Sequence, residues 1–118
     1  MTAEQYKELQ KRLSTIQAFL KIEEKRLQLK EEELKTQDPS FWDDPKKAEE
    51  KMKHIRGLKY WVETFDKTAT AVADLEILME FVREGMAEES ELDAQHKSLL
   101  AEIEELELKN MLSNEEDG

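Results

Sequence analysis

Two histidines and several runs of glutamate are the residues of this sequence whose types could bind a metal ion or move a proton. His54 and His96 stand far apart, and neither has a second histidine four residues away on the same helical face. Cysteine is absent, which excludes thiol nucleophiles and cysteine-ligated zinc. Runs such as 31–33 would lie along a straight helix, whereas calcium and magnesium need oxygens that converge at a turn. We therefore expect no metal ion, no cofactor and no catalytic residue, with His54 on the surface and His96 half-buried.

The overall composition favours a helical, non-enzymatic domain. The 118 residues are enough for one modest core, and 40% of them are charged while glycine and proline contribute only 3 and 2. No stretch approaches the roughly 18 consecutive apolar residues of a membrane helix. The residues at positions 1–7 lack the basic and then apolar order of a secretory signal. We expect a soluble cytoplasmic protein that does not contact a membrane.

The negative charge is confined to the second half of the chain. Residues 1–37 carry a net charge of +1, residues 38–67 a net charge of 0, and residues 68–118 a net charge of -12. The acidic half would repel phosphate. Any contact with nucleic acid is therefore expected through the balanced first half.

Residues 3–37 are predicted to form one long helix. Alternating steps of three and four residues from position 6 to position 34 meet apolar or aromatic side chains at seven of nine positions, the spacing of a coiled-coil stripe. The two exceptions are Glu23 and Lys30. Thr2 and Gln5 have the spacing of a capping box at the start of this helix. The apolar stripe consists of Tyr6, Leu9, Leu13, Ile16, Leu20, Leu27 and Leu34.

A turn after this helix is predicted from its prolines. Pro39 disfavours helical geometry at the residue before it, and Asp44 followed by Pro45 is typical of a helix start. Phe41 and Trp42 are large apolar side chains inside this turn. We expect both rings to fold back and cover the end of a helical bundle.

A second helix is predicted over residues 45–84 and a third over residues 89–111. Gly85 has the position of a left-handed residue that ends a helix, and Ser90 is predicted to cap the next one. Gly57, inside the second helix, could mark a close approach of two helices or a mild bend. A break near positions 66 to 71 is left open, because threonines lower helix propensity there.

Three helices joined by short turns predict the fold class. It is all-α, an elongated antiparallel three-helix bundle or coiled coil. Residues 1–112 are expected to form a single helical domain, and residues 113–118 a polar tail.

Basic residues recur along the second helix and form a candidate surface for a polyanion. Glu49 and Glu50 interrupt them, which weakens the pattern. Tyr60 and Trp61 are adjacent, so they point in different directions, and we expect one of them to be exposed beside the basic residues. The candidate contact residues are Lys47, Lys51, Arg56 and Lys59.

Three segments of the sequence resemble a known family. The stretch from Gln37 to Ala48, with its Phe-Trp pair between two Asp-Pro pairs, closely resembles the N-terminal helical domain of bacterial peptide chain release factor 2. Upstream, residues 17–20 resemble the entry into the family's long first helix. Downstream, residues 106–113 resemble the exit toward the next domain, which is the codon-recognition domain. The Phe-Trp turn distinguishes factor 2 from the sister factor 1.

The resemblance implies a role in translation termination. A protein of this family enters a ribosome stalled at a stop codon and triggers hydrolysis of peptidyl-tRNA, and its N-terminal domain reaches toward the stalk base of the large subunit. The family reads the codon with a Ser-Pro-Phe loop and assists hydrolysis with a Gly-Gly-Gln loop. Both motifs are absent here, and no two glycines are adjacent. The resemblance therefore implies a ribosome-docking domain without the catalytic loops, which meets nucleic acid only through the ribosome.

A protein of a different class remains an alternative. A free-standing coiled-coil adaptor or chaperone-like scaffold would have the same composition and apolar stripes. A reading frame that continues past Gly118 into Gly-Gly-Gln would favour the release factor, whereas a natural stop there would favour the adaptor. Uncovered apolar surface could also allow the chain to form a homodimer.

Overall fold

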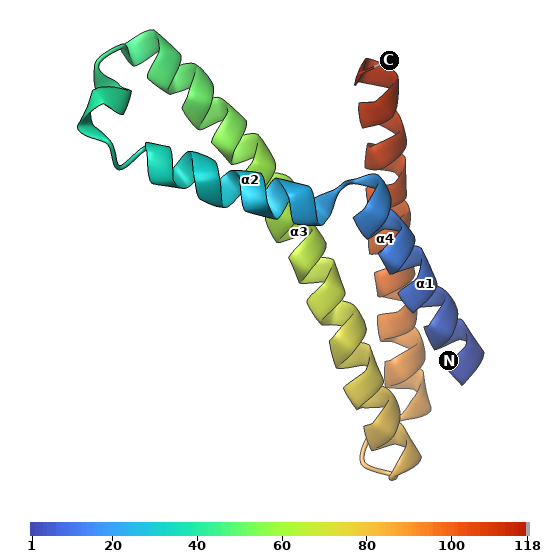
Figure 1. Ribbon diagram of the computed structural model, residues 1–118. Helices are drawn as coiled ribbons and strands as arrows, with labels where there is room; N and C mark the ends of the chain where they lie inside the picture. The colour runs from blue at the N-terminus through green and yellow to red at the C-terminus, as the bar shows by residue number, and fades with distance from the viewer. Residues whose placement is uncertain (118) are drawn as a thin grey trace. The chain divides into compact units, whose positions relative to one another are not determined.

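Helices are the only regular secondary structure in the part of the chain that the structure describes, which confirms the all-α prediction. The computed structural model describes the backbone of residues 1–117 and the side chains of residues 1–113. The elements in order are α1 (Ala3–Phe19), α2 (Ile22–Lys35), the 3₁₀ turn η1 (Pro39–Trp42), α3 (Pro45–Arg83) and α4 (Glu89–Asp117) (Figure 1).

The chain divides into two compact units. Unit 1 comprises Met1–Leu20 and Asp66–Gly118, and unit 2 comprises Lys21–Phe65. Unit 1 therefore contains α1, the second part of α3, and α4, whereas unit 2 contains α2, η1 and the first part of α3. The helix α3 belongs to both.

Unit 1 is an antiparallel bundle of three helical segments, as predicted. The Met1 ammonium pairs with Asp93 and Arg12 pairs with Glu107, so later residues of α1 contact later residues of α4. These two helices are therefore parallel, and α3, which joins α4 through a short turn, is antiparallel to both (Figure 1). The buried apolar side chains of this unit are Tyr6, Leu9, Ile16, Leu20, Val72, Leu75, Leu92, Leu99, Ile103 and Leu106.

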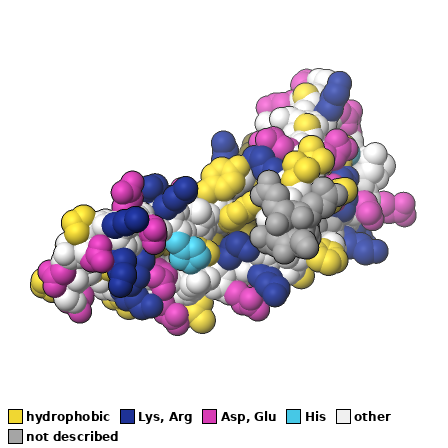
Figure 2. All heavy atoms as spheres, turned by 90° about the horizontal axis from the view of Figure 1, so that it is seen from above, with side chains coloured by type: hydrophobic (Ala, Val, Ile, Leu, Met, Phe, Trp, Pro, Cys, Tyr) yellow, Lys and Arg dark blue, Asp and Glu magenta, His cyan; other side chains and the backbone are white. Residues whose placement is uncertain are grey.

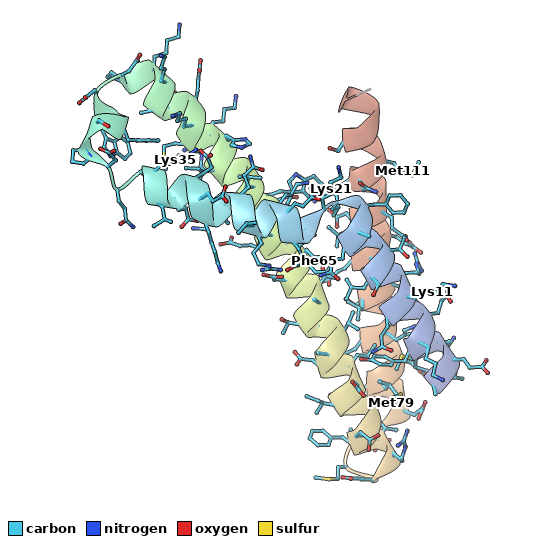
Figure 3. The ribbon with its side chains drawn as sticks, in the orientation of Figure 1. Lys11, Lys21, Lys35, Phe65, Met79 and Met111 are labelled. Carbon is cyan, nitrogen blue, oxygen red and sulfur yellow. The ribbon has the colours of Figure 1, made fainter. Side chains whose placement is uncertain are left out.

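The prediction of one helix over residues 3–37 is wrong, because Lys21 separates α1 from α2 (Figure 3). Lys21 has a left-handed backbone with φ of 53°, which interrupts the helical hydrogen-bond ladder and starts the side-chain register anew. Ile22 is fully buried after this break. In contrast, Leu27 and Leu34, both predicted to be buried, are 61% and 66% exposed.

Unit 2 is a hairpin in which α2 runs antiparallel to the first part of α3 (Figure 1). The α3 residues that are buried here recur at steps of three, four and seven, as expected for one face of a helix. The buried apolar side chains of this unit are Ile22, Ala48, Ile55, Leu58, Val62 and Phe65.

The prediction that Phe41 and Trp42 cover the end of a bundle is also wrong. Trp42 is 53% exposed and Phe41 is only half-buried. The two rings pack edge to face on each other, with centroids 4.8 Å apart, and the Trp42 indole N–H donates to the Thr36 carbonyl oxygen at 3.0 Å. Only two helices belong to this unit, so there is no three-helix end for the rings to cover.

The start of α3 agrees with the prediction. Pro45 is its first residue, and an oxygen of the Asp44 carboxylate accepts a hydrogen bond from the Lys47 backbone N–H at 3.3 Å. The helix is continuous through positions 66 to 71. Gly57 marks no close approach, because an added Cβ would meet nothing within 4 Å. The helix ends at Arg83, and Gly85, whose φ is 78°, is the predicted left-handed residue just after it.

The predicted bounds of the last helix need correction. α4 begins at Glu89, and the Leu92 backbone N–H bonds to the Glu88 carbonyl oxygen, so Ser90 lies inside the helix and does not cap it. α4 continues to Asp117 and does not stop at residue 111. The extension has a simple cause, because no glycine or proline stands between residue 111 and Gly118, which itself lies outside the described residues.

Candidate interaction surface

The two units differ sharply in charge. Unit 2 contains 11 basic and 11 acidic residues, whereas unit 1 contains 7 basic and 18 acidic residues. The entire net charge of -11 therefore belongs to unit 1. Figure 2 shows the Lys and Arg side chains of the hairpin interspersed with Asp and Glu. Unit 2 is the part of the chain that an anionic partner could approach without strong repulsion.

The four predicted contact residues are all exposed on α3, but they do not share one face. Lys47 and Lys51 lie one turn apart on one side of the helix. Arg56 and Lys59 lie together on another side, since residues three or four apart are helical neighbours. Lys47 and Arg56 are separated by about two and a half turns, which places them on opposite sides. The structure thus groups the predicted residues into two pairs.

Lys51 of the first pair lies beside the aromatic turn. The Lys51 ammonium nitrogen is 5.6 Å from the centroid of the Phe41 ring, a cation–π arrangement. The adjoining Trp42 ring is held through its N–H and remains half open to solvent. Lysines on α3 near a turn with a fixed, exposed indole form a surface that can combine charge attraction with stacking or apolar contact.

A further outward-facing strip was not recognised as one surface from the sequence. Lys46, Lys53 and Tyr60 recur every seven residues on α3, so they lie along one side of the helix. Tyr60 is 46% exposed and packs edge to face on the half-buried Trp61, with centroids 5.6 Å apart. This confirms that one ring of the adjacent pair is exposed. The seven-residue spacing was the signal that could have found the strip.

In the second pair, an acidic neighbour limits the free charge of Lys59. The Lys59 ammonium lies 3.9 Å from the Glu63 carboxylate one turn later. An exposed pair of this kind contributes little to stability, so it can be exchanged for a contact with a partner at low cost.

The two histidines lie in different units and have different surroundings. His54 is exposed, and its Nε2 is 3.2 Å from the amide nitrogen of Gln28. His96 is half-buried, as predicted, and burial lowers its pKa from the ordinary value of 6.5. Among the described residues, no three carboxylates or histidines come together as a potential metal site.

His96 lines a small pocket in unit 1 with Glu8 and Arg12. Its volume is about 170 Å³, below the range of roughly 300 to 1,000 Å³ that holds most small-molecule ligands. The Arg12 guanidinium is already bound to Glu107 on α4, at 2.5 Å. No serine or threonine lines this pocket, so it offers no hydroxyl nucleophile.

Within the described residues, no helix is both long and apolar enough to span a membrane. Comparison with known proteins identifies residues 24–118 as a match to the PCRF domain family. The chain is 34% identical over 112 residues to peptide chain release factor 2 of Acidovorax sp. (strain JS42), covering 93% of this chain and 30% of that protein. It is 32% identical to the factor of the same name in Clostridium perfringens (strain SM101 / Type A), covering 93% and 30%.

A third relative covers nearly the whole chain. Peptide chain release factor 2 of Nautilia profundicola is 32% identical over 118 residues, which is 98% of this chain and 32% of that protein. The chain therefore spans about 30% of the length of the relatives that it matches. Because the family model matches most of the chain, including the whole of α3 and the hairpin turn, the protein belongs to the PCRF domain family.

Proposed function

We propose that this chain is the ribosome-docking domain of a release factor of the factor 2 type, acting in translation termination in the cytoplasm. The observation that carries the proposal is the match over nearly the whole chain to proteins named peptide chain release factor 2. The domain binds and positions, and it performs no hydrolysis itself. The absence of adjacent glycines and of a Ser-Pro-Phe sequence supports this division of labour.

The hairpin of unit 2 is the surface that contacts the ribosome in this proposal. It holds 11 of the 18 basic residues, and its exposed rings are fixed by local contacts. Unit 1 has a large negative charge and would be repelled by ribosomal RNA. By the family resemblance, the target is the stalk base of the large subunit.

Charge reversal tests which surface contacts the ribosome. In the complete protein that carries this chain, Lys47, Lys51 and Arg56 are replaced together by glutamate. Affinity for ribosomes stopped at a stop codon is then measured between about 50 and 200 mM salt, the range over which contacts with RNA phosphates change affinity strongly. We expect weaker binding and a shallower dependence on salt.

A matched variant controls for the change in net charge. Lys7, Lys11 and Lys97 are exposed residues of unit 1, and their replacement by glutamate changes the charge by the same amount. We expect this control to bind ribosomes nearly as the unmodified protein does. Equal binding of all three proteins at low salt would reject the hairpin as the contact surface. Failure of the unmodified complete protein to release peptide at a stop codon would reject the function itself.

A further inference from the structure

Unit 1 contains a groove between α3 and α4, on a different side of α4 from the residues that contact α1. Two adjoining pockets form it, and Gln95 of α4 lines both. One pocket has a volume of about 310 Å³. The other has a volume of about 160 Å³ and is lined in part by Leu75, Leu99 and Glu102. The residues that line the larger pocket with Gln95 are Asp74, Ile77, Leu78 and Phe81.

The larger pocket has apolar walls that no other described residue covers. Ile77 is 54% exposed and Phe81 is 43% exposed. The two residues are one helical turn apart, so they lie on the same face of α3. Leu78 extends this face toward α4. An apolar face with a groove beside it is the kind of surface that receives the apolar side of an amphipathic helix.

The charge around the groove determines which partner fits. Asp74 and Glu102 line its two pockets, and unit 1 carries 18 acidic residues against 7 basic ones. Phosphate backbones are repelled by this surface. A second copy would bring its own acidic unit, so a symmetric contact through the groove is opposed by like charge. A segment with lysine or arginine beside its apolar residues is attracted.

We propose that the α3–α4 groove binds an amphipathic basic helix of another protein, whose apolar residues enter the two pockets while its lysines or arginines pair with the acidic rim. This goes beyond ribosome docking through unit 2, because it assigns a second and chemically different binding surface to unit 1. The partner class is a protein segment and not a nucleic acid.

A designed peptide tests the proposal with the 118-residue chain. The probe is a helical peptide of about 18 residues with leucines on one face and lysines beside them, and binding is followed by fluorescence anisotropy. One control peptide has the same composition in an order that destroys the apolar face. A second has glutamate in place of lysine. We expect binding by the probe alone, with an affinity that falls as salt is added.

Two variants of matched exposure locate the site. Ile77→Asp places a charge in the groove, and we expect it to weaken binding of the probe by at least about tenfold. Leu108→Asp adds the same charge at a residue that is 55% exposed and lines neither pocket, and we expect a change of less than about twofold. Phe81→Ala provides a second, uncharged test of the groove, and circular dichroism checks that each variant is folded.

Three results would overturn the proposal. Equal weakening by Ile77→Asp and Leu108→Asp would show general attraction to an acidic protein. Equal binding of the rearranged peptide would show that the apolar face is not recognised. Sedimentation that reveals a dimer of the chain, lost in Ile77→Asp, would assign the groove to a second copy instead of a basic helix.

Discussion

The Tyr6 hydroxyl on α1 donates a hydrogen bond to the carbonyl oxygen of Val72 on α3, at 3.2 Å. The Glu76 carboxylate lies 3.3 Å from the same hydroxyl. Tyr6 is almost completely buried, so its ring also contributes apolar contact to the core of unit 1. Removal of the hydroxyl tests the hydrogen bond while the ring is kept.

Tyr6→Phe is expected to lower the free energy of unfolding by about 1 kcal/mol, the usual net contribution of one such hydrogen bond. Urea denaturation followed by circular dichroism measures the change. Tyr60→Phe is the matched control, because Tyr60 is 46% exposed and should lose less. Equal stability of Tyr6→Phe and the unmodified protein would show that the bond to Val72 contributes nothing.

The same residue predicts a loss of stability in alkali. Burial, and then the negative charge of Glu76, raise the pKa of Tyr6 above its ordinary value of 10.0. Because the pKa of Tyr6 is higher in the folded than in the unfolded chain, the folded state favours the neutral hydroxyl. The contribution of Tyr6 to stability is therefore complete below about pH 10 and is lost as the pH rises through the folded-state pKa. Tyr6→Phe should remove this part of the alkaline loss. Parallel urea curves at pH 8 and in alkali would reveal it.

Lys21→Gly is expected to stabilise the protein by about 0.5 to 1 kcal/mol, because glycine adopts a left-handed backbone without the steric cost that a side chain imposes. Lys30→Gly, the same exchange at an exposed position inside α2, should destabilise by a similar amount. Thermal unfolding of the two variants gives shifts of opposite sign. Destabilisation by both exchanges would contradict the left-handed break.

The two described glycines predict opposite effects of alanine. Gly57→Ala should stabilise α3 by about 1 kcal/mol, since the added methyl group meets nothing within 4 Å. Gly85→Ala should destabilise, because Gly85 has φ of 78°, where a Cβ is strained. Urea denaturation of the pair checks both signs. A loss of stability in Gly57→Ala would mean that Gly57 is required for a contact or bend absent from this structure.

The lowered pKa of His96 predicts that the stability of the protein falls in acid. Burial, followed by the positive charge of the Met1 ammonium, lowers its pKa below 6.5, although Asp93 acts in the opposite direction. The folded protein therefore prefers the neutral ring, and stability is expected to fall as the pH drops below about 6.5 toward the folded-state pKa. Proton NMR of the ring signals, assigned with His54→Gln, measures the midpoint. A midpoint above 6.5 would contradict the burial argument, and His96→Gln should lessen the acid loss.

The sequence predicted those parts of the fold that depend on local chemistry. Pro39 ends the helical run, Asp44 and Pro45 begin α3, and Gly85 ends it, because each residue type restricts the backbone at its own position. The buried residues of α3 also recur at steps of three, four and seven, the spacing of one helical face. The family resemblance rested on the turn between α2 and α3, and the comparisons confirm it.

The break at Lys21 could not be predicted in the same way, since lysine carries no preference for a left-handed backbone. A signal was nevertheless present. The two charged residues in the predicted stripe, Glu23 and Lys30, both follow the break, where the register has changed. Leu27 and Leu34 continued the apolar spacing of the first part of the stripe, so the spacing alone did not indicate that the register changes after Lys21. The split of the four candidate contact residues was visible from their spacing, but their common role stays a prediction.

Because α3 is continuous through both units, the unfolding of one unit affects the other. Its 39 residues carry one uninterrupted ladder of backbone hydrogen bonds through both units. If either unit unfolds, its part of α3 loses the packing that supports it. The end of α3 that remains in the folded unit then frays, because isolated helical segments are marginal in water. Hydrogen exchange in the middle of α3 should therefore report the opening of whichever unit unfolds first.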